Sequence, residues 1–118
     1  MMPMTHRMLL VEDDELTCSL MRSIFASKDL EVITAHSVAE ALDLLNSRPD
    51  YLILDCTLPD GDGIEVLERV RADGLPTRVA VVSGWSELWT VEGLRPDAVV
   101  RKPVNIDELM RALGIVSS

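Results

Sequence analysis

The residues of this sequence that could do chemistry follow short apolar segments, and most of them are acidic. They are Glu12-Asp13-Asp14, Asp55, Ser83 and Lys102. Carboxylates gathered within a few ångströms repel one another, so a site built from them requires a cation. Oxygen ligands, with no His or Cys among the candidate groups, favour Mg²⁺, or Mn²⁺, over zinc. The residue types therefore predict a divalent-cation site, provided that the fold brings these segments together.

The other groups extend this chemistry to phosphate. Lys102 can offset negative charge and meet an anionic substrate, and Ser83 offers a hydroxyl to the same anion. A carboxylate nucleophile, a metal ion, a cation and a hydroxyl donor together suit phosphoryl transfer. Each residue alone has a plainer interpretation: Asp14 is predicted to cap a helix, and a single lysine is by default solvated. Their combination, in a chain with only two lysines, favours the phosphoryl-transfer hypothesis.

The elements that would position these groups are readable from apolar spacing. Five apolar segments predict strands, at residues 8–11, 32–35, 51–54, 79–82 and 98–100. Most lack alternation, which is typical of parallel strands buried on both faces. Between them lie stripes with the spacing of amphipathic helices. The stripes are Leu16/Leu20/Ile24, Val38/Ala41/Leu42/Leu45, Ile64/Leu67/Val70 and Ile106/Leu109/Met110/Leu113.

Strands that alternate with helices predict an α/β doubly wound sheet. Sites in such sheets lie at the carboxyl ends of the strands, where the acidic and polar groups would meet. Ser37 and Asn105 are predicted N-caps, each with a glutamate three residues on, and Asp62 is predicted to cap the helix that follows it. Residues 86–94 contain poor helix formers and predict a short or frayed fourth helix.

Composition limits the partners and the setting. The 118 residues predict one domain, and the formal net charge of −9 argues against a nucleic-acid surface and against docking on an anionic membrane. Aromatic residues make up only 3%, so stacking on bases is not expected. Cys18 and Cys56 make neither a disulfide framework nor a zinc site, and each is interpreted as a small buried hydrophobe. No apolar stretch has the length of a membrane span, and we expect a reducing, cytoplasmic setting.

Four motifs resemble the receiver domain of two-component response regulators. They are MLLVEDD (residues 8–14), LDCTLPDGDG (residues 54–63), VVSG (residues 81–84) and Lys102-Pro103. The resemblance implies a five-stranded parallel sheet of order 2-1-3-4-5 with helices on both faces, the CheY-like form of the flavodoxin-like fold. It also implies a single receiver domain over residues 7–116, after a short tail of residues 1–6, with no output domain in this chain.

The resemblance implies a role for each carboxylate. Asp55 would be the phosphoacceptor. Glu12 and Asp13 would be the acidic pair that holds Mg²⁺, with Asp13 the more direct ligand. Asp55 and the main-chain carbonyl of Thr57 would complete the protein's share of the ligands.

Two further residues would act on the phosphoryl group. Ser83 would bond a phosphoryl oxygen and move on activation, and Lys102 would pair with the group. The Lys102-Pro103 peptide bond is predicted to be cis. Thr57 and Trp85 would flank the approach of water, and because neither can act as a general base we expect slow self-dephosphorylation.

The implied function is to accept a phosphoryl group from a histidine kinase or a phosphotransfer protein and to shift between two conformations. The chain would catalyse only its own phosphorylation and dephosphorylation. Its output partner is expected at the face formed by the fourth helix, the fifth strand and the fifth helix, and a phosphorylation-dependent homodimer is one form such an output could take. The family usually carries an aromatic residue where this chain has Val99, so movement of residues 83–94 is expected to replace the usual ring rotation.

Two alternatives stay open on the sequence alone. One is a receiver-like interaction module that works without phosphorylation. The other is a small phosphohydrolase with an aspartyl-phosphate intermediate, although the second Asp of the usual Asp-x-Asp motif is absent after Asp55.

Overall fold

A five-stranded parallel sheet forms the centre of the molecule. The computed structural model describes residues 6–55, 57–83 and 96–115, and for Thr57 and Ser83 it describes the backbone only. The strands of the sheet are β1 (His6–Val11), β2 (Leu30–Ala35), β3 (Tyr51–Asp55), β6 (Arg78–Ser83) and β7 (Ala98–Arg101). Their order is β2-β1-β3-β6-β7, which is the predicted order 2-1-3-4-5 when these five strands alone are counted. The predicted fold class is confirmed.

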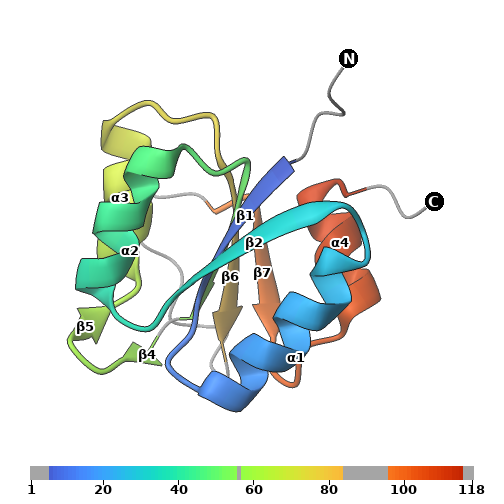
Figure 1. The fold of residues 1–118 in the computed structure, drawn as a ribbon. Coiled ribbons are helices and arrows are strands. Elements are labelled where there is room, and N and C mark those ends of the chain that lie inside the picture. The colour runs from blue at the N-terminus through green and yellow to red at the C-terminus, as the bar shows by residue number, and fades with distance from the viewer. Residues whose placement is uncertain (1–5, 56, 84–95, 116–118) are drawn as a thin grey trace.

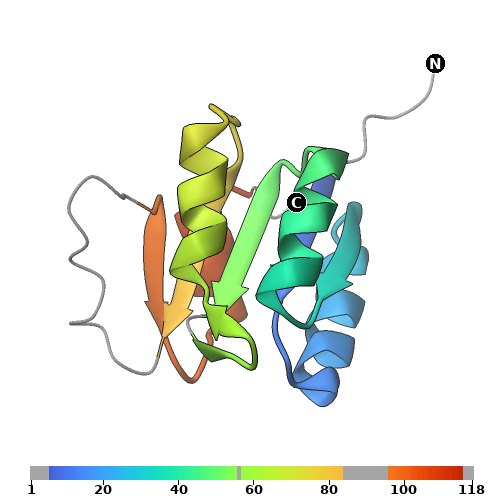
Figure 2. The same ribbon diagram turned by 90° about the vertical axis from the view of Figure 1, so that its left-hand side faces the viewer.

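Helices cover both faces of this sheet (Figures 1 and 2). On one face lie α1 (Glu15–Ala26) and α4 (Ile106–Leu113). On the other face lie α2 (Val38–Leu44), continued by the 3-10 helix η1 (Leu45–Ser47), and α3 (Ile64–Ala72). The predicted fourth helix, residues 86–94, lies outside the described residues.

The two apolar layers explain why the strands lack alternation. In β1, Met8 and Leu10 pack in the layer with α1 and α4, while Leu9 and Val11 pack in the layer with α2 and α3. All four side chains are at most 1% exposed. Each of these four residues therefore faces a helix layer, so all four positions are apolar.

Helix α1 buries a different face from its most regular apolar stripe. Cys18 and Phe25 pack against the sheet, whereas Leu16, Leu20 and Ile24 are 70%, 58% and 38% exposed. The stripe correctly predicts the helix, but it does not mark the buried side. Both sets have helical spacing, and only the position of the sheet decides between them.

The predicted helix caps are present. Asp14, Ser37 and Asn105 each accept a hydrogen bond from the backbone N–H three residues on. Asp62 accepts one from the N–H two residues on, although Gly63 is the N-cap residue of α3. The strands begin or end within two residues of their predicted bounds, and β1 already includes His6, the last residue of the predicted tail.

A short hairpin precedes α3. It consists of β4 (Thr57–Leu58) and β5 (Gly61–Asp62), which pair antiparallel. This hairpin was not predicted from the sequence, because two-residue strands carry no periodic signal.

None of the helices in the described part of the chain has both the length and the apolar character that a membrane span requires.

Candidate functional site

The predicted site residues converge at the carboxyl edge of the sheet. Glu12 follows β1 directly, Asp55 ends β3, Ser83 ends β6 and Lys102 follows β7. Neighbouring strands run in parallel register, with Asp55 opposite Val82 and Ser83 opposite Arg101. These groups lie far apart along the chain, and the order of the strands in the sheet brings them to one edge.

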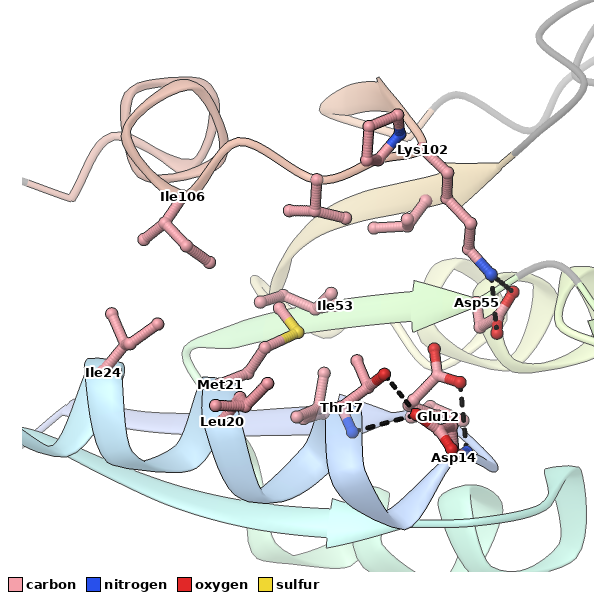
Figure 3. Close-up of a pocket in the computed structure, with 15 residues that line it drawn as sticks. Glu12, Asp14, Thr17, Leu20, Met21, Ile24, Ile53, Asp55, Lys102 and Ile106 are labelled. Carbon is pink, nitrogen blue, oxygen red and sulfur yellow. Dashed lines mark hydrogen bonds and ion pairs between the residues drawn. The ribbon is translucent and has the colours of Figure 1, made fainter.

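Asp55 is a buried carboxylate that faces a lysine. Its side chain is 5% exposed, and the ammonium nitrogen Nζ of Lys102 lies 3.3 Å from Oδ2 and 3.4 Å from Oδ1 (Figure 3). A buried carboxylate without a charge partner would be costly to hold ionised. The peptide bond between Lys102 and Pro103 is cis, as predicted.

Glu12 is the second buried acid of the site. Burial and, after it, the side-chain hydrogen bond with Asp55 raise the pKa of Glu12 from 4.5 to about 7. Two hydrogen bonds hold the segment in place: the Asp14 N–H donates to Glu12 Oε1 at 3.1 Å, and the Glu12 N–H donates to the Ala35 carbonyl at 2.9 Å. Without a bound cation, burial thus favours a proton on the Glu12 carboxyl.

This proton gives a testable pH dependence. Because the folded-state pKa of Glu12 lies above the unfolded value, its neutral form stabilises the fold fully below pH 4.5, and this stabilisation is lost as the pH rises through about 7. In EDTA, Glu12→Gln should therefore show a smaller fall in the free energy of unfolding across this window than the wild type. Urea unfolding at several pH values measures it, with the exposed Glu68→Gln as control. A Glu12→Gln profile that matches the wild type would contradict the shift.

The acids fit a divalent cation. One carboxylate oxygen each from Glu12, Asp13 and Asp55 lies within 4.8 Å of the others, and Asp13 is exposed where the other two are buried. Only oxygen donors are present in this group, which suits Mg²⁺ or Mn²⁺. The negative charge of Asp55 is one of the causes that raise the pKa of Glu12, so the carboxylates repel one another without a cation.

The remaining predicted residues divide into three groups. Asp14 does not belong to the group of three acids, and its carboxylate caps α1 by accepting a hydrogen bond from the Thr17 N–H, as predicted. For Thr57 and Ser83 the backbone lies at this edge, in β4 and β6. Cys56 and Trp85 lie outside the described residues.

Gly63 touches the site, although nothing in the sequence pointed to such a role. A Cβ at this position would overlap the Asp55 carbonyl oxygen and would lie 3.1 Å from Cγ of Leu54. Its φ of −55° is ordinary for any residue, so close approach alone calls for glycine here. Glycine after an acidic turn is common, and the sequence carried no further signal.

A pocket of about 480 Å³ extends from the acids between α1 and α4 (Figure 3). Glu12, Asp55 and Lys102 lie at one end. The rest is mainly apolar, with Leu20 and Ile24 of α1 on one wall and other lining residues from the sheet and the segment around Pro103. The exposed stripe of α1 is thus continuous with the acidic edge.

Comparison with known proteins agrees with this fold. The sequence matches the response regulator receiver domain over residues 8–114, and the chain belongs to that family. The transcriptional regulatory protein CpxR of Escherichia coli (strain K12) is 35% identical over 113 residues, which cover 94% of this chain and 49% of CpxR. The chain thus spans about half the length of this curated relative.

Solved structures share the fold. A response regulator receiver domain protein (CheY-like) from Methanospirillum hungatei JF-1 has a TM-score of 0.84 at 25% identity, covering 94% of this chain and 92% of that one. A response regulator protein from Burkholderia pseudomallei, solved with a phosphorylated aspartic acid, a calcium ion and citrate, has a TM-score of 0.82 at 20% identity, covering 92% of this chain and 66% of that one. The chain is a receiver domain of two-component response regulators.

Proposed function

We propose that Asp55 accepts a phosphoryl group from a phosphohistidine of a histidine kinase or a phosphotransfer protein. The observation that carries this proposal is the buried Asp55 carboxylate, held between Lys102 on one side and the acids Glu12 and Asp13 on the other. An Asp55 oxygen attacks phosphorus, a P–O bond forms as the P–N bond breaks, and the electron pair of the broken bond stays with the imidazole.

The charges around Asp55 assign the supporting roles. Three carboxylates and one lysine leave the site negative, so an incoming phosphoryl group meets net repulsion. Glu12, Asp13, Asp55 and the Thr57 carbonyl would hold Mg²⁺, which when bound offsets negative charge on the phosphoryl oxygens. Lys102 pairs with a phosphoryl oxygen in place of its present bond to Asp55.

Ser83 would take part after transfer. Ser83 is the last residue of β6 and pairs with Arg101, the residue before Lys102. Ser83 and Lys102 therefore lie at neighbouring points of the same edge of the sheet. A hydroxyl donor there would bond a phosphoryl oxygen and couple the phosphate to the chain that follows β6. We propose this as the origin of a conformational change that regulates a partner in the cytoplasm.

The direct test uses a small donor. Incubation with acetyl phosphate and Mg²⁺ should add one phosphoryl group, which intact mass spectrometry detects. Continuous release of inorganic phosphate at a rate far above the decay of the phosphoprotein would instead favour a phosphohydrolase. No feature of the described residues favours that alternative, or a module that works without phosphate.

We further propose that the protein donor docks on the exposed stripe of α1. A protein donor must bring its phosphohistidine to Asp55 and cover the surface around it. Leu16, Leu20 and Ile24 form an exposed apolar row, and the last two line the pocket that ends at Asp55. An apolar row of this kind is a common core for a protein interface.

Leu20→Glu should therefore separate the two kinds of donor. Phosphotransfer from a histidine kinase that phosphorylates the wild type should slow by at least about tenfold, because a charge enters the apolar centre of the interface. Phosphorylation by acetyl phosphate should stay within about twofold, since surface changes away from the reacting atoms leave the site intact. Ser19→Glu, on an exposed side of α1 outside this row, is the matched control. Equal slowing in both variants, or with both donors, would contradict the docking site.

A further inference from the structure

Asp60 links the hairpin after Asp55 to the start of α2. Its Oδ1 accepts a hydrogen bond from the Val38 N–H at 2.8 Å, and its Oδ2 accepts one from the Ala39 N–H at 3.1 Å. These hydrogen bonds hold the pKa of Asp60 below its usual range, so the carboxylate accepts them in its charged form. Because Asp60 lies far along the chain from the start of α2, this cap is a tertiary contact and not a local one.

The hairpin that carries Asp60 begins beside the phosphoacceptor. Thr57 pairs with Asp62, and Leu58 pairs with Gly61, so Asp60 lies at the tip. Strands of two residues do not hold a hairpin by themselves. Leu58 is 6% exposed and packs with Val38 in the α2 and α3 layer. Figure 1 shows the hairpin against the first turn of α2.

The start of α2 is also tied to the other side of the site. Ala35, the last residue of β2, accepts the hydrogen bond from the Glu12 N–H. Two residues later Ser37 is the N-cap residue of α2, and Asp60 accepts hydrogen bonds from the first two helical N–H groups. The backbone that carries Glu12 and the hairpin that begins at Thr57 thus rest on the same short segment.

A purely local role for Asp60 would be to cap α2. The helix already has a local cap, because Ser37 accepts from the Glu40 N–H at 3.2 Å. Asp60 adds two hydrogen bonds that cross 22 and 21 residues of sequence. These two bonds connect the tip of the hairpin to α2 directly.

We propose that Asp60 is a positioning residue for the divalent-cation site: by fixing the hairpin tip to the start of α2, it holds the Thr57 carbonyl at the carboxyl edge where Glu12, Asp13 and Asp55 meet. The inference rests on the proposed function, in which that carbonyl is a metal ligand. Asp60 itself contacts neither the metal nor the phosphoryl group.

The test compares Asp60→Ala with Ser37→Ala. Both remove a cap of α2, and both should lower the urea midpoint, but only the first frees the hairpin. The dissociation constant of Mn²⁺ for the unphosphorylated protein, measured by calorimetry, should rise about five- to tenfold in Asp60→Ala, because part of the free energy of the two lost charge-assisted hydrogen bonds no longer holds the hairpin in its metal-binding position. It should change less than about twofold in Ser37→Ala, whose hairpin contacts remain.

Salt and a conservative variant separate positioning from simple charge loss. At about 0.5 M NaCl the Debye length lies between roughly 3 and 10 Å. The difference in the Mn²⁺ dissociation constant between Asp60→Ala and the wild type should persist there. Asp60→Asn keeps one acceptor oxygen, so its Mn²⁺ dissociation constant should lie between those of the wild type and Asp60→Ala. At saturating Mg²⁺, the rate of phosphorylation by acetyl phosphate should return close to the wild-type rate, because the metal affinity changes and not the chemistry.

The outcomes distinguish this inference from the proposed function. If the wild type binds Mn²⁺ and is phosphorylated, but Asp60→Ala and Ser37→Ala weaken Mn²⁺ binding equally or not at all, the positioning role is wrong while the proposed function stands. A difference that disappears at high salt also overturns the positioning role. If the wild type neither binds Mn²⁺ nor is phosphorylated, both fail.

Discussion

Asp55→Asn is expected to abolish phosphorylation by acetyl phosphate in the presence of Mg²⁺. The amide is nearly the same size as the carboxylate, so the fold should persist, but it lacks the anionic oxygen that attacks phosphorus. Removal of divalent cations with EDTA should abolish the reaction in the wild type as well, because the acids of the site repel the phosphoryl group without a cation. Intact mass spectrometry measures both effects.

The matched control is Asp43→Asn, which removes an exposed carboxylate on α2 away from the site. It should be phosphorylated like the wild type. A phosphoryl group found on Asp55→Asn would show that another residue is the acceptor. Phosphorylation of the wild type that is undiminished in EDTA would contradict the metal-dependent mechanism.

Gly63→Ala is expected to destabilise the protein by about 1–3 kcal/mol and to impair phosphorylation, because overpacking against fixed atoms forces the backbone to shift. The added Cβ would overlap the Asp55 carbonyl oxygen, and the next contacts are to the fully buried Leu54. At an unstrained helical position, Gly to Ala would normally stabilise by about 0.4–1 kcal/mol through the unfolded state. A lower free energy of unfolding in Gly63→Ala would therefore indicate the close approach of residue 63 to the Asp55 backbone.

Gly74→Ala separates this clash from backbone strain. Gly74 has a φ of +64°, a Cβ added there would meet no atom within 4 Å, and the residue lies after α3, away from the site. Its substitution should cost about 1–2 kcal/mol from the left-handed conformation, with phosphorylation by acetyl phosphate unchanged. Urea unfolding and intact mass spectrometry measure the two variants side by side. A Gly63→Ala variant as stable as the wild type would show that the backbone near Asp55 yields easily.

The sheet was predictable because its strands are apolar on both sides. Residues 8–11 have no alternation, since Met8 and Leu9 enter opposite helix layers, and this pattern is typical of a central parallel strand. Once the strands are known, the acids and the lysine that follow them must meet at one edge. The placement of Lys102 and Asp55 at the same edge therefore follows from the strand order, whereas their 3.3 Å contact depends on the conformation of the Lys102 side chain.

The orientation of α1 was not predictable in the same way. Leu16, Leu20 and Ile24 form the more regular stripe, yet Cys18 and Phe25 are the buried residues. Hydrophobic spacing identifies a helix, but two apolar stripes on one helix give the same period. The choice depends on where the sheet lies and on which apolar surface a partner protein could cover.

Residue types and their spacing were enough to establish the family, the order of strands and helices, the local helix caps and the set of charged groups at one edge, because all of these are encoded along the chain. The contacts between segments that no local pattern connects emerged only from the packing of the folded chain. Asp60 reaches the N–H groups of Val38 and Ala39, and Gly63 lies against the backbone of Asp55. Both contacts depend on distances of a few ångströms between elements that pack independently, and sequence spacing carries no information about such distances.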